Sequence, residues 1–232
     1  MVALGGHAIV TAGLKACTTG ATTAVVQTFR SALVALGGGA LAATLTLGCG
    51  SVTPTAGFWY DDGPLALPAP AAEKLGGLLT RDELESIKTS SRAELERAFA
   101  GMRLQIVDNH SAFWRVEVSR TLRGHGPLPN AGESLSFGWL GGAGAVSFDL
   151  VALKALQYAP AGASRQVIID AIGRGIGRVA AHELAHQMIH SAEAHNPGDE
   201  NSYEYPSSDR AAQYYSELHW TTARPLLERT LR

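Results

Sequence analysis

Cysteine is nearly absent from the chain: only Cys17 and Cys49 occur among its 232 residues. Both precede the part of the sequence that is rich in charged side chains. A globular domain built from the remainder therefore has no disulfide available and depends on its hydrophobic core for stability. The roughly 160 residues from residue 73 onward suffice for one domain with a substantial core.

Two kinds of charge are also scarce: acidic residues in the first part of the chain, and an excess of positive charge in the rest. Residues 1–48 contain no acidic residue, and Lys15 and Arg30 are their only bases. The remainder lacks a positive excess, since it holds 17 basic against 21 acidic residues and carries a net charge of −4. Domains that bind nucleic acid usually carry an excess of basic residues. This chain has no such excess, so we expect no nucleic-acid partner.

Residues 1–49 form an expected export segment. Arg30 precedes a nearly uncharged apolar run over residues 31–48, which ends in a small residue before Cys49. A positive start, an apolar stretch and a small residue are typical of a secretory signal. Three consecutive glycines with several alanines and threonines disfavour the alternative of a membrane span. Residues 1–25 are interpreted as extra sequence upstream of the signal.

The end of the apolar run, Leu47-Gly48-Cys49, resembles the lipobox of bacterial lipoproteins. The resemblance implies that Cys49 is lipidated and that the protein is anchored in, or secreted from, a bacterial cell envelope. Thr46 and Leu47 depart from the lipobox, which usually has leucine and then a small residue at these two places. A cleaved soluble signal and an uncleaved anchor are the alternatives.

Residues 50–72 contain four prolines and few charges, which predicts an extended tether to the globular domain. Residues 58–60, Phe-Trp-Tyr, are too apolar for a spacer and are expected to dock on the domain. The domain itself is expected over residues 73–232.

Helices and strands both leave signals in this domain. Two capping boxes, beginning at Thr80 and Ser91, and a long apolar periodicity predict helices over residues 81–88, 92–101 and 164–189. Alternating apolar residues predict strands over residues 104–107, 114–118, 134–140 and 145–151. Glycines at 173, 175 and 177 indicate that the long helix is kinked or packed tightly against a neighbour. The expected fold is α+β, with a small mixed sheet.

The long helix contains the sequence His182-Glu183-Leu184-Ala185-His186. Positions four apart lie on one helix face, about 6 Å apart along the axis, so both imidazoles can reach one zinc ion. Glu183 then stands beside the metal as a general base. This is the H-E-x-x-H arrangement of zinc peptidases, and it predicts a zinc cofactor.

The order of the elements resembles the N-terminal half of the zincin peptidases, in which the active-site helix precedes a C-terminal helical or loop lobe. In that fold, as the resemblance implies, an edge strand lies antiparallel to the substrate above the zinc. Residues 145–151 are the candidate for this strand, because an exposed edge can hold an extended peptide through its backbone.

A catalytic zinc site usually has a third protein ligand. His190 would continue the series at 182 and 186, but eight helical residues advance about 12 Å and rotate roughly 80°, so it fits only if the helix ends earlier. His195 fits better, since the chain can turn over residues 191–194. Glu204 and Glu217 remain alternatives, as in gluzincins.

His195 also resembles the third histidine of the metzincin clan. Three departures from that clan are present. Ile189 stands where the clan has glycine, His195 comes three residues late, and Glu204 replaces the methionine of the Met-turn in the segment 202–206.

The expected function is a secreted or membrane-tethered zinc metallopeptidase that hydrolyses a peptide or protein substrate. Glu183 is the expected base, and Tyr205 is expected to donate a hydrogen bond to the oxyanion, with Tyr203 and His219 as alternates. The alternative is a non-catalytic envelope lipoprotein with a structural zinc or a partner-binding role. The sequence leaves the substrate and the oligomeric state open.

Overall fold

The computed structural model describes residues 53–63, 65–122, 130–137, 140–189 and 195–232. The expected export segment, with Cys49, and the candidate ligand His190 lie outside these residues. Within the described ranges, no helix combines the length and the hydropathy that crossing a bilayer requires.

The described strands form one mixed five-stranded sheet with the order β2-β1-β3-β5-β4. β1, β2, β3 and β5 run parallel, and β4 pairs antiparallel with β5 at one edge. Together with the helices this confirms the predicted α+β class and the mixed sheet. The strands are β1 (Thr55–Tyr60), β2 (Gln105–Val107), β3 (Trp114–Ser119), β4 (Gly132–Ser136) and β5 (Gly142–Ser147).

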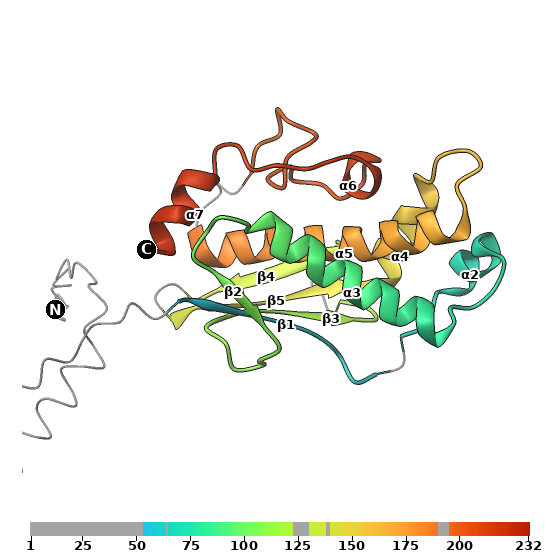
Figure 1. Ribbon diagram of the computed structural model, residues 1–232, viewed down its shortest axis with the longest axis horizontal. Coiled ribbons are helices and arrows are strands. Elements are labelled where there is room, and N and C mark those ends of the chain that lie inside the picture. The colour runs from blue at the N-terminus through green and yellow to red at the C-terminus, as the bar shows by residue number, and fades with distance from the viewer. Residues whose placement is uncertain (1–52, 64, 123–129, 138–139, 190–194) are drawn as a thin grey trace, which may run out of the picture. The chain divides into compact units, whose positions relative to one another are not determined.

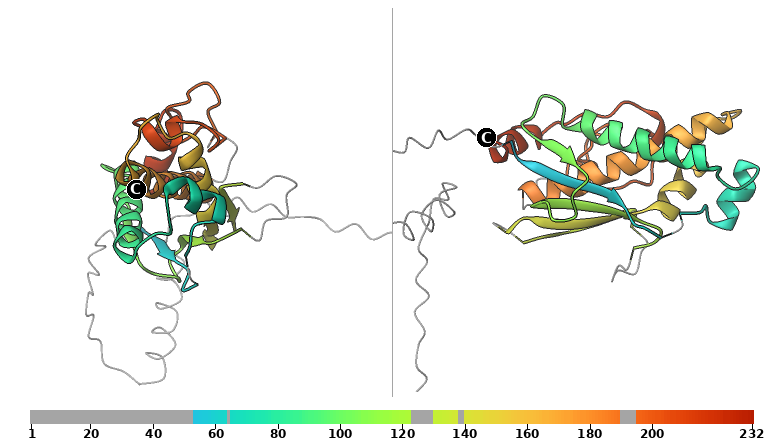
Figure 2. Two further views of the ribbon diagram at one scale, coloured as in Figure 1. Left: turned by 90° about the vertical axis from the view of Figure 1, so that its right-hand side faces the viewer. Right: turned by 60° about the horizontal axis from the view of Figure 1, so that its bottom comes forward.

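Helices cover one face of this sheet. α3 and α5 lie side by side above the strands, and the C-terminal segment with α6 and α7 covers the far side of α5 (Figures 1 and 2). The long α5 is thus buried on nearly all sides, and it carries the H-E-x-x-H sequence. The helices are α2 (Ala69–Leu75), α3 (Arg81–Ala98), α4 (Phe148–Gln157), α5 (Arg165–Ile189), α6 (Ala212–Tyr215) and α7 (Arg224–Thr230).

The glycines of α5 are sites of close helix packing. A Cβ atom added at Gly173 would collide with Ser90, and one added at Gly177 would collide with the carbonyl oxygen of Ser91, both on α3. Gly175 faces the ring of Tyr214 in the same way. The tight packing expected from the sequence is therefore confirmed, and α5 matches the predicted helix over 164–189 to within one residue.

The tether expected over residues 50–72 is wrong for much of its length. Residues 55–60 form β1, an inner strand that pairs with both β2 and β3. Phe58 is only 3 % exposed in the core. The strand is buried because parallel neighbours on both sides satisfy its backbone, and residues 69–75 then form α2. The folded domain therefore begins earlier in the chain than residue 73, the start expected from the sequence.

The two helices expected over 81–88 and 92–101 are one helix, α3. The capping box at Thr80 is confirmed, since the Thr80 hydroxyl accepts from the Glu83 backbone and the Glu83 carboxylate accepts from the Thr80 backbone. The second box does not form. Ser91 is buried inside the helix, where its hydroxyl bonds the carbonyl of Lys88.

The strands predicted over 104–107 and 114–118 are confirmed as β2 and β3. The strand predicted over 145–151 ends at Ser147, whose side chain accepts a hydrogen bond from Leu150 and caps α4. This strand is β5, an inner strand, so it is wrong as the candidate edge. The edge strand beside α5 is β4, which begins at residue 132 and ends at residue 136. The strand expected there spanned residues 134–140.

Candidate metal centre

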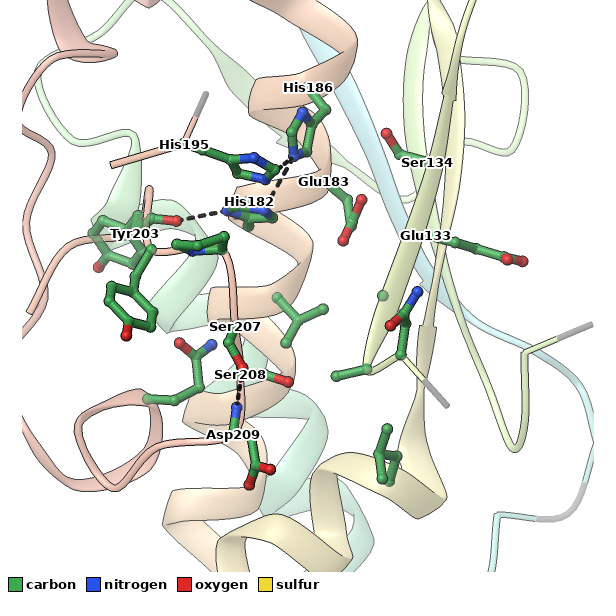
Figure 3. A pocket seen from close by; sticks show the side chains of 18 of the residues that line it. Glu133, Ser134, His182, Glu183, His186, His195, Tyr203, Ser207, Ser208 and Asp209 are labelled. Carbon is green, nitrogen blue, oxygen red and sulfur yellow. Dashed lines mark hydrogen bonds between the residues drawn. The ribbon is translucent and has the colours of Figure 1, made fainter. Parts of the chain in front are cut away.

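Three histidines converge at the C-terminal half of α5 (Figure 3). His182 and His186 lie one turn apart on α5, and their Nε2 atoms are 3.1 Å apart. His195 comes from the segment after the helix, and its Nε2 is 3.1 Å from that of His186. One ligand atom from each residue lies within 4.8 Å of the other two. The structure thus brings His195, as expected, to the histidine pair.

This arrangement fits a metal ion. Nitrogen ligands at 2.0–2.1 Å from a tetrahedral zinc lie about 3.3 Å from one another, close to the observed separations. Three imidazoles so near one another would repel if protonated, and metal ligands must be deprotonated. The residues can therefore hold a metal, and the geometry by itself does not identify which one.

Backbone contacts fix the orientation of His182. Its Nδ1 donates a hydrogen bond of 2.8 Å to the carbonyl oxygen of Tyr203. Because a carbonyl only accepts, the proton is on Nδ1 and the lone pair is on Nε2, which faces the other histidines. Burial, with the neighbouring His186, lowers the pKa of His182 to about 3, and burial also lowers the pKa of His186. Both imidazoles are therefore neutral near pH 7.

His195 is exposed, and its neighbour Asn196 anchors the segment that carries it. The Asn196 backbone N–H donates to the carbonyl of Glu204 at 2.8 Å, and its side-chain amide donates to the Thr221 hydroxyl at 2.8 Å. Glu204 is fully buried, so Asn196 is attached to the interior of the C-terminal lobe. These two bonds hold the third imidazole in place.

Glu204 does not converge with the three histidines. Its carboxylate lies just before α7 and accepts hydrogen bonds from the backbone N–H groups of residues 221–223 and from the hydroxyls of Thr221 and Thr222, at 2.6 to 3.1 Å. These donors use its oxygens fully, and a negative charge before a helix is favoured by the helix dipole.

Replacement of Glu204 by glutamine should weaken metal binding about 10- to 100-fold, the usual effect of losing a group that orients a ligand. An amide can accept on one atom only, so some of the five donors would be left unpaired and the His195 segment would loosen. A competition titration with a chromogenic zinc chelator measures the affinity. Glu217→Gln is the matched control, because that side chain is 92 % exposed. Equal affinities for E204Q and the unmodified protein would contradict the role.

The other expected site residues fall in three places. Glu217 lies on the surface, 3.5 Å from Arg97, and does not join the histidines. Tyr203 is buried and lines the cavity, but its hydroxyl donates to Glu94 on α3. His219 lies 2.9 Å from Asp199 and is absent from the lining of the cavity at the histidines.

Tyr205 does line that cavity, as its expected role requires. The guanidinium of Arg210 lies 4.6 Å from the centre of its ring, a cation–π contact. Arg210 in turn donates to the carbonyls of Ser202 and Ser207. The buried arginine therefore holds the loop on which Tyr205 reaches the cavity.

Glu183 lies on the flank of α5 that faces β4 (Figure 3) and is 7 % exposed. Burial raises the pKa of its carboxyl to about 8, and a hydrogen bond from Ser134 partly opposes that rise. Gly132 makes the close approach possible, because a Cβ atom there would collide with the Glu183 side chain. A carboxyl that is this deeply buried beside a cavity is suited to exchange protons near neutral pH.

The cavity at the histidines has a volume of about 1040 Å³. It extends from His186 along α5 to α4, with β4 on one side and the loop after Tyr203 on the other. Beyond the histidines and Glu183, its lining combines apolar surface with polar side chains, which include Asn130, Glu133, Ser134, Ser136, Lys154, Tyr205, Ser207, Ser208, Asp209 and Gln213. A long cavity bordered by an edge strand suits an extended ligand.

A buried ion pair, which no sequence pattern predicted, joins α5 to α3 one helical turn before His182. Arg178, one turn before His182, lies 2.7 Å from Glu94 on α3, and both side chains are at most 2 % exposed. Glu94 also accepts from the Tyr203 hydroxyl at 3.1 Å, and the Tyr203 carbonyl holds His182. Arg178, a charged residue inside an apolar stretch of α5, was the sequence signal that could have indicated this ion pair.

Sequence reasoning also missed the contributions of Gly132, Ser134 and Asn196. Their roles arise from contacts with residues far along the chain, which no local pattern marks. Comparison with known proteins adds no relative: no family model matches the chain, no curated protein matches it, and no solved structure matches it.

Proposed function

We propose that the protein is a zinc-dependent peptidase that acts at a membrane or outside the cell. The observation that carries this proposal is the convergence of three imidazole nitrogens beside Glu183, a buried carboxyl on the helix that also carries His182 and His186. This set matches the requirement of hydrolytic zinc sites for three protein ligands, an open position and a base.

The openness of the site favours catalysis over a structural metal. Structural zinc sites have four protein ligands and are closed, whereas three histidines gather here among the described residues and the third is exposed. The cavity beside them leaves room for a substrate. A bound zinc ion would supply Lewis acidity, which makes water more acidic and a carbonyl carbon more electrophilic.

The protein side chains have distinct roles in this proposal. Glu183 takes a proton from the attacking water and delivers it to the amine that leaves. Ser134 and the backbone at Gly132 keep the Glu183 carboxyl turned toward the cavity. Tyr205 donates a hydrogen bond to the oxygen on which negative charge develops.

The edge strand β4 supports a peptide as substrate. Only one side of β4 pairs within the described sheet, and Gly132, Ser134 and Ser136 line the cavity. An extended peptide can pair with the other side through its backbone. If it lies antiparallel to β4, its residues after the scissile bond point toward α4, where Lys154 and Asp209 line the cavity.

A peptide-library digest of the full chain tests this function. We expect internal peptide bonds to be cleaved, cleavage to stop after chelation, and zinc to restore it. His195→Ala should abolish hydrolysis, while His219→Ala, which alters an exposed histidine outside the cavity, should not. A protein that binds zinc stoichiometrically but cleaves no member of the library would support the structural or partner-binding alternative.

A further inference from the structure

The end of the domain at which the parallel strands begin carries a group of exposed apolar side chains. Its members are Phe113, Leu135, Phe137 and Leu140, which are 46–67 % exposed and are together called the apolar tip. Large apolar side chains gathered on a surface indicate an interaction site, whereas isolated ones are ordinary. We propose that the apolar tip docks on the surface of a lipid bilayer.

The backbone holds the tip together around the turn between β4 and β5. The N–H of Phe137 donates to the carbonyl oxygen of Gly141 at 2.8 Å, and the N–H of Leu140 donates to the carbonyl oxygen of Phe137 at 3.2 Å. Gly142 donates to the carbonyl of Phe113 at 3.0 Å, which attaches the start of β3 to the same turn. The tip is thus a fixed part of the sheet.

The chain enters the domain at this same end. Ala56 near the start of β1 pairs with Trp114, and Trp114 pairs with Gly142, so the three strands begin side by side. Cys49 and the apolar run over residues 31–48 lie just before β1 in the sequence, with Thr55 only six residues after Cys49. Six residues span at most about 20 Å, so a membrane that holds this segment lies within reach of the tip.

Basic residues lie at the same end. Figures 1 and 2 both place α7 and the C-terminus beside the start of the strands, and the Thr230 hydroxyl bonds the carbonyl of Met188 near the end of α5. α7 and the residues after it contain Arg224, Arg229 and Arg232, all exposed, against a single acid, Glu228. In a chain with net charge −2, this local excess favours a surface with anionic headgroups.

A bilayer is therefore the partner that this surface fits, since an apolar tip with nearby arginines, next to an apolar leader, is the pattern of interfacial binding. The proposal does not depend on peptide hydrolysis. It adds that the domain lies against the membrane with the metal centre close by, because Gly142 beside the tip packs on Gln187, the residue after His186.

Depth-dependent fluorescence quenching tests the docking in the full chain. Cys17 and Cys49 are replaced by serine, and one cysteine is introduced by Leu140→Cys and labelled with an environment-sensitive fluorophore. Vesicles of phosphatidylcholine and phosphatidylglycerol, with or without spin-labelled lipid, are the probe. Leu78→Cys is the matched control, since Leu78 is 71 % exposed in the segment between α2 and α3, and Figure 1 shows that this segment lies at the opposite end of the domain.

We expect a blue shift at position 140 only when vesicles are added, and quenching by spin-labelled lipid at least about twofold stronger than at position 78. Vesicles without phosphatidylglycerol should reduce the effect. Absent or equal quenching at the two positions would overturn the proposal. A blue shift without vesicles would also overturn it, because the tip would then be covered by the chain's own N-terminal segment or by a second copy.

Discussion

Replacement of Glu183 by glutamine should lower peptide hydrolysis by a factor of about 10² to 10⁴ and leave the metal content unchanged. Glutamine is nearly isosteric with glutamate and still fits between α5 and Gly132, but it cannot accept a proton from water. Glu183 is not one of the three converging ligands, so the metal should stay bound. Steady-state kinetics and metal analysis on the same sample measure both quantities.

Glu133→Gln is the matched control for this prediction. Glu133 lines the same cavity from the adjacent strand and acts on Glu183 only through charge repulsion. Its replacement should change the rate less than about tenfold, because it exchanges no proton with the substrate. If E183Q stays active while E133Q is inactive, the assignment of the base is wrong.

Replacement of Arg178 by methionine should destabilise the protein by about 3–5 kcal/mol, the usual cost of removing one partner from a buried ion pair. The guanidinium donates to Glu94 and also to the carbonyls of Ala212, Gln213 and Ser216, so it joins α3 to the C-terminal lobe. Methionine fills much of the volume but leaves three carbonyls without the Arg178 donor, and the Glu94 carboxylate keeps only Tyr203 and the half-exposed Arg97 as partners. For a domain of this size the loss corresponds to a Tm roughly 10 °C lower.

Arg97→Met is the control, because Arg97 bonds the same Glu94 carboxylate but is 46 % exposed. An ion pair at the surface contributes about 1 kcal/mol or less. Thermal unfolding followed by circular dichroism distinguishes the two. Similar losses in R178M and R97M would mean that burial of the Arg178 pair does not determine its contribution.

Local patterns predicted the helix that carries the site. The spacing of apolar residues predicted α5 to within a residue, because its periodicity extends over seven turns of a buried helix. The three glycines predicted its close packing. The His182 and His186 pair followed from helical geometry alone, and the choice of His195 followed from where the helix could end. These features depend on residues near one another in sequence.

Features set by distant contacts were missed. β1 was expected in a tether because prolines surround it, yet pairing with β2 and β3 makes it an inner strand. The second capping box was expected to begin at Ser91 and to use Glu94 as its fourth residue. The Glu94 carboxylate instead accepts a hydrogen bond from Arg178, which lies 84 residues later in the chain, on α5. Such partners are invisible to a short sequence window.

The edge of the sheet and the role of Glu204 were missed for the same reason. Strand order depends on the pairing of all five strands. β5 was therefore predicted as an edge strand, whereas β4 pairs with its outer side and forms the edge. Glu204 has the chemistry of a metal ligand, but donors 17 to 19 residues further along the chain use its oxygens. Residue type alone cannot distinguish a ligand from a buried acceptor.

X-ray absorption spectroscopy of the purified full chain, with metal analysis, tests the central claim most directly. We predict one zinc per chain with three imidazole nitrogens and one oxygen at about 2.0–2.1 Å. One imidazole should be lost in His195→Ala and none in Glu217→Gln. A spectrum with two imidazoles that His195→Ala leaves unchanged, or a protein that binds no zinc, would contradict the three-histidine centre.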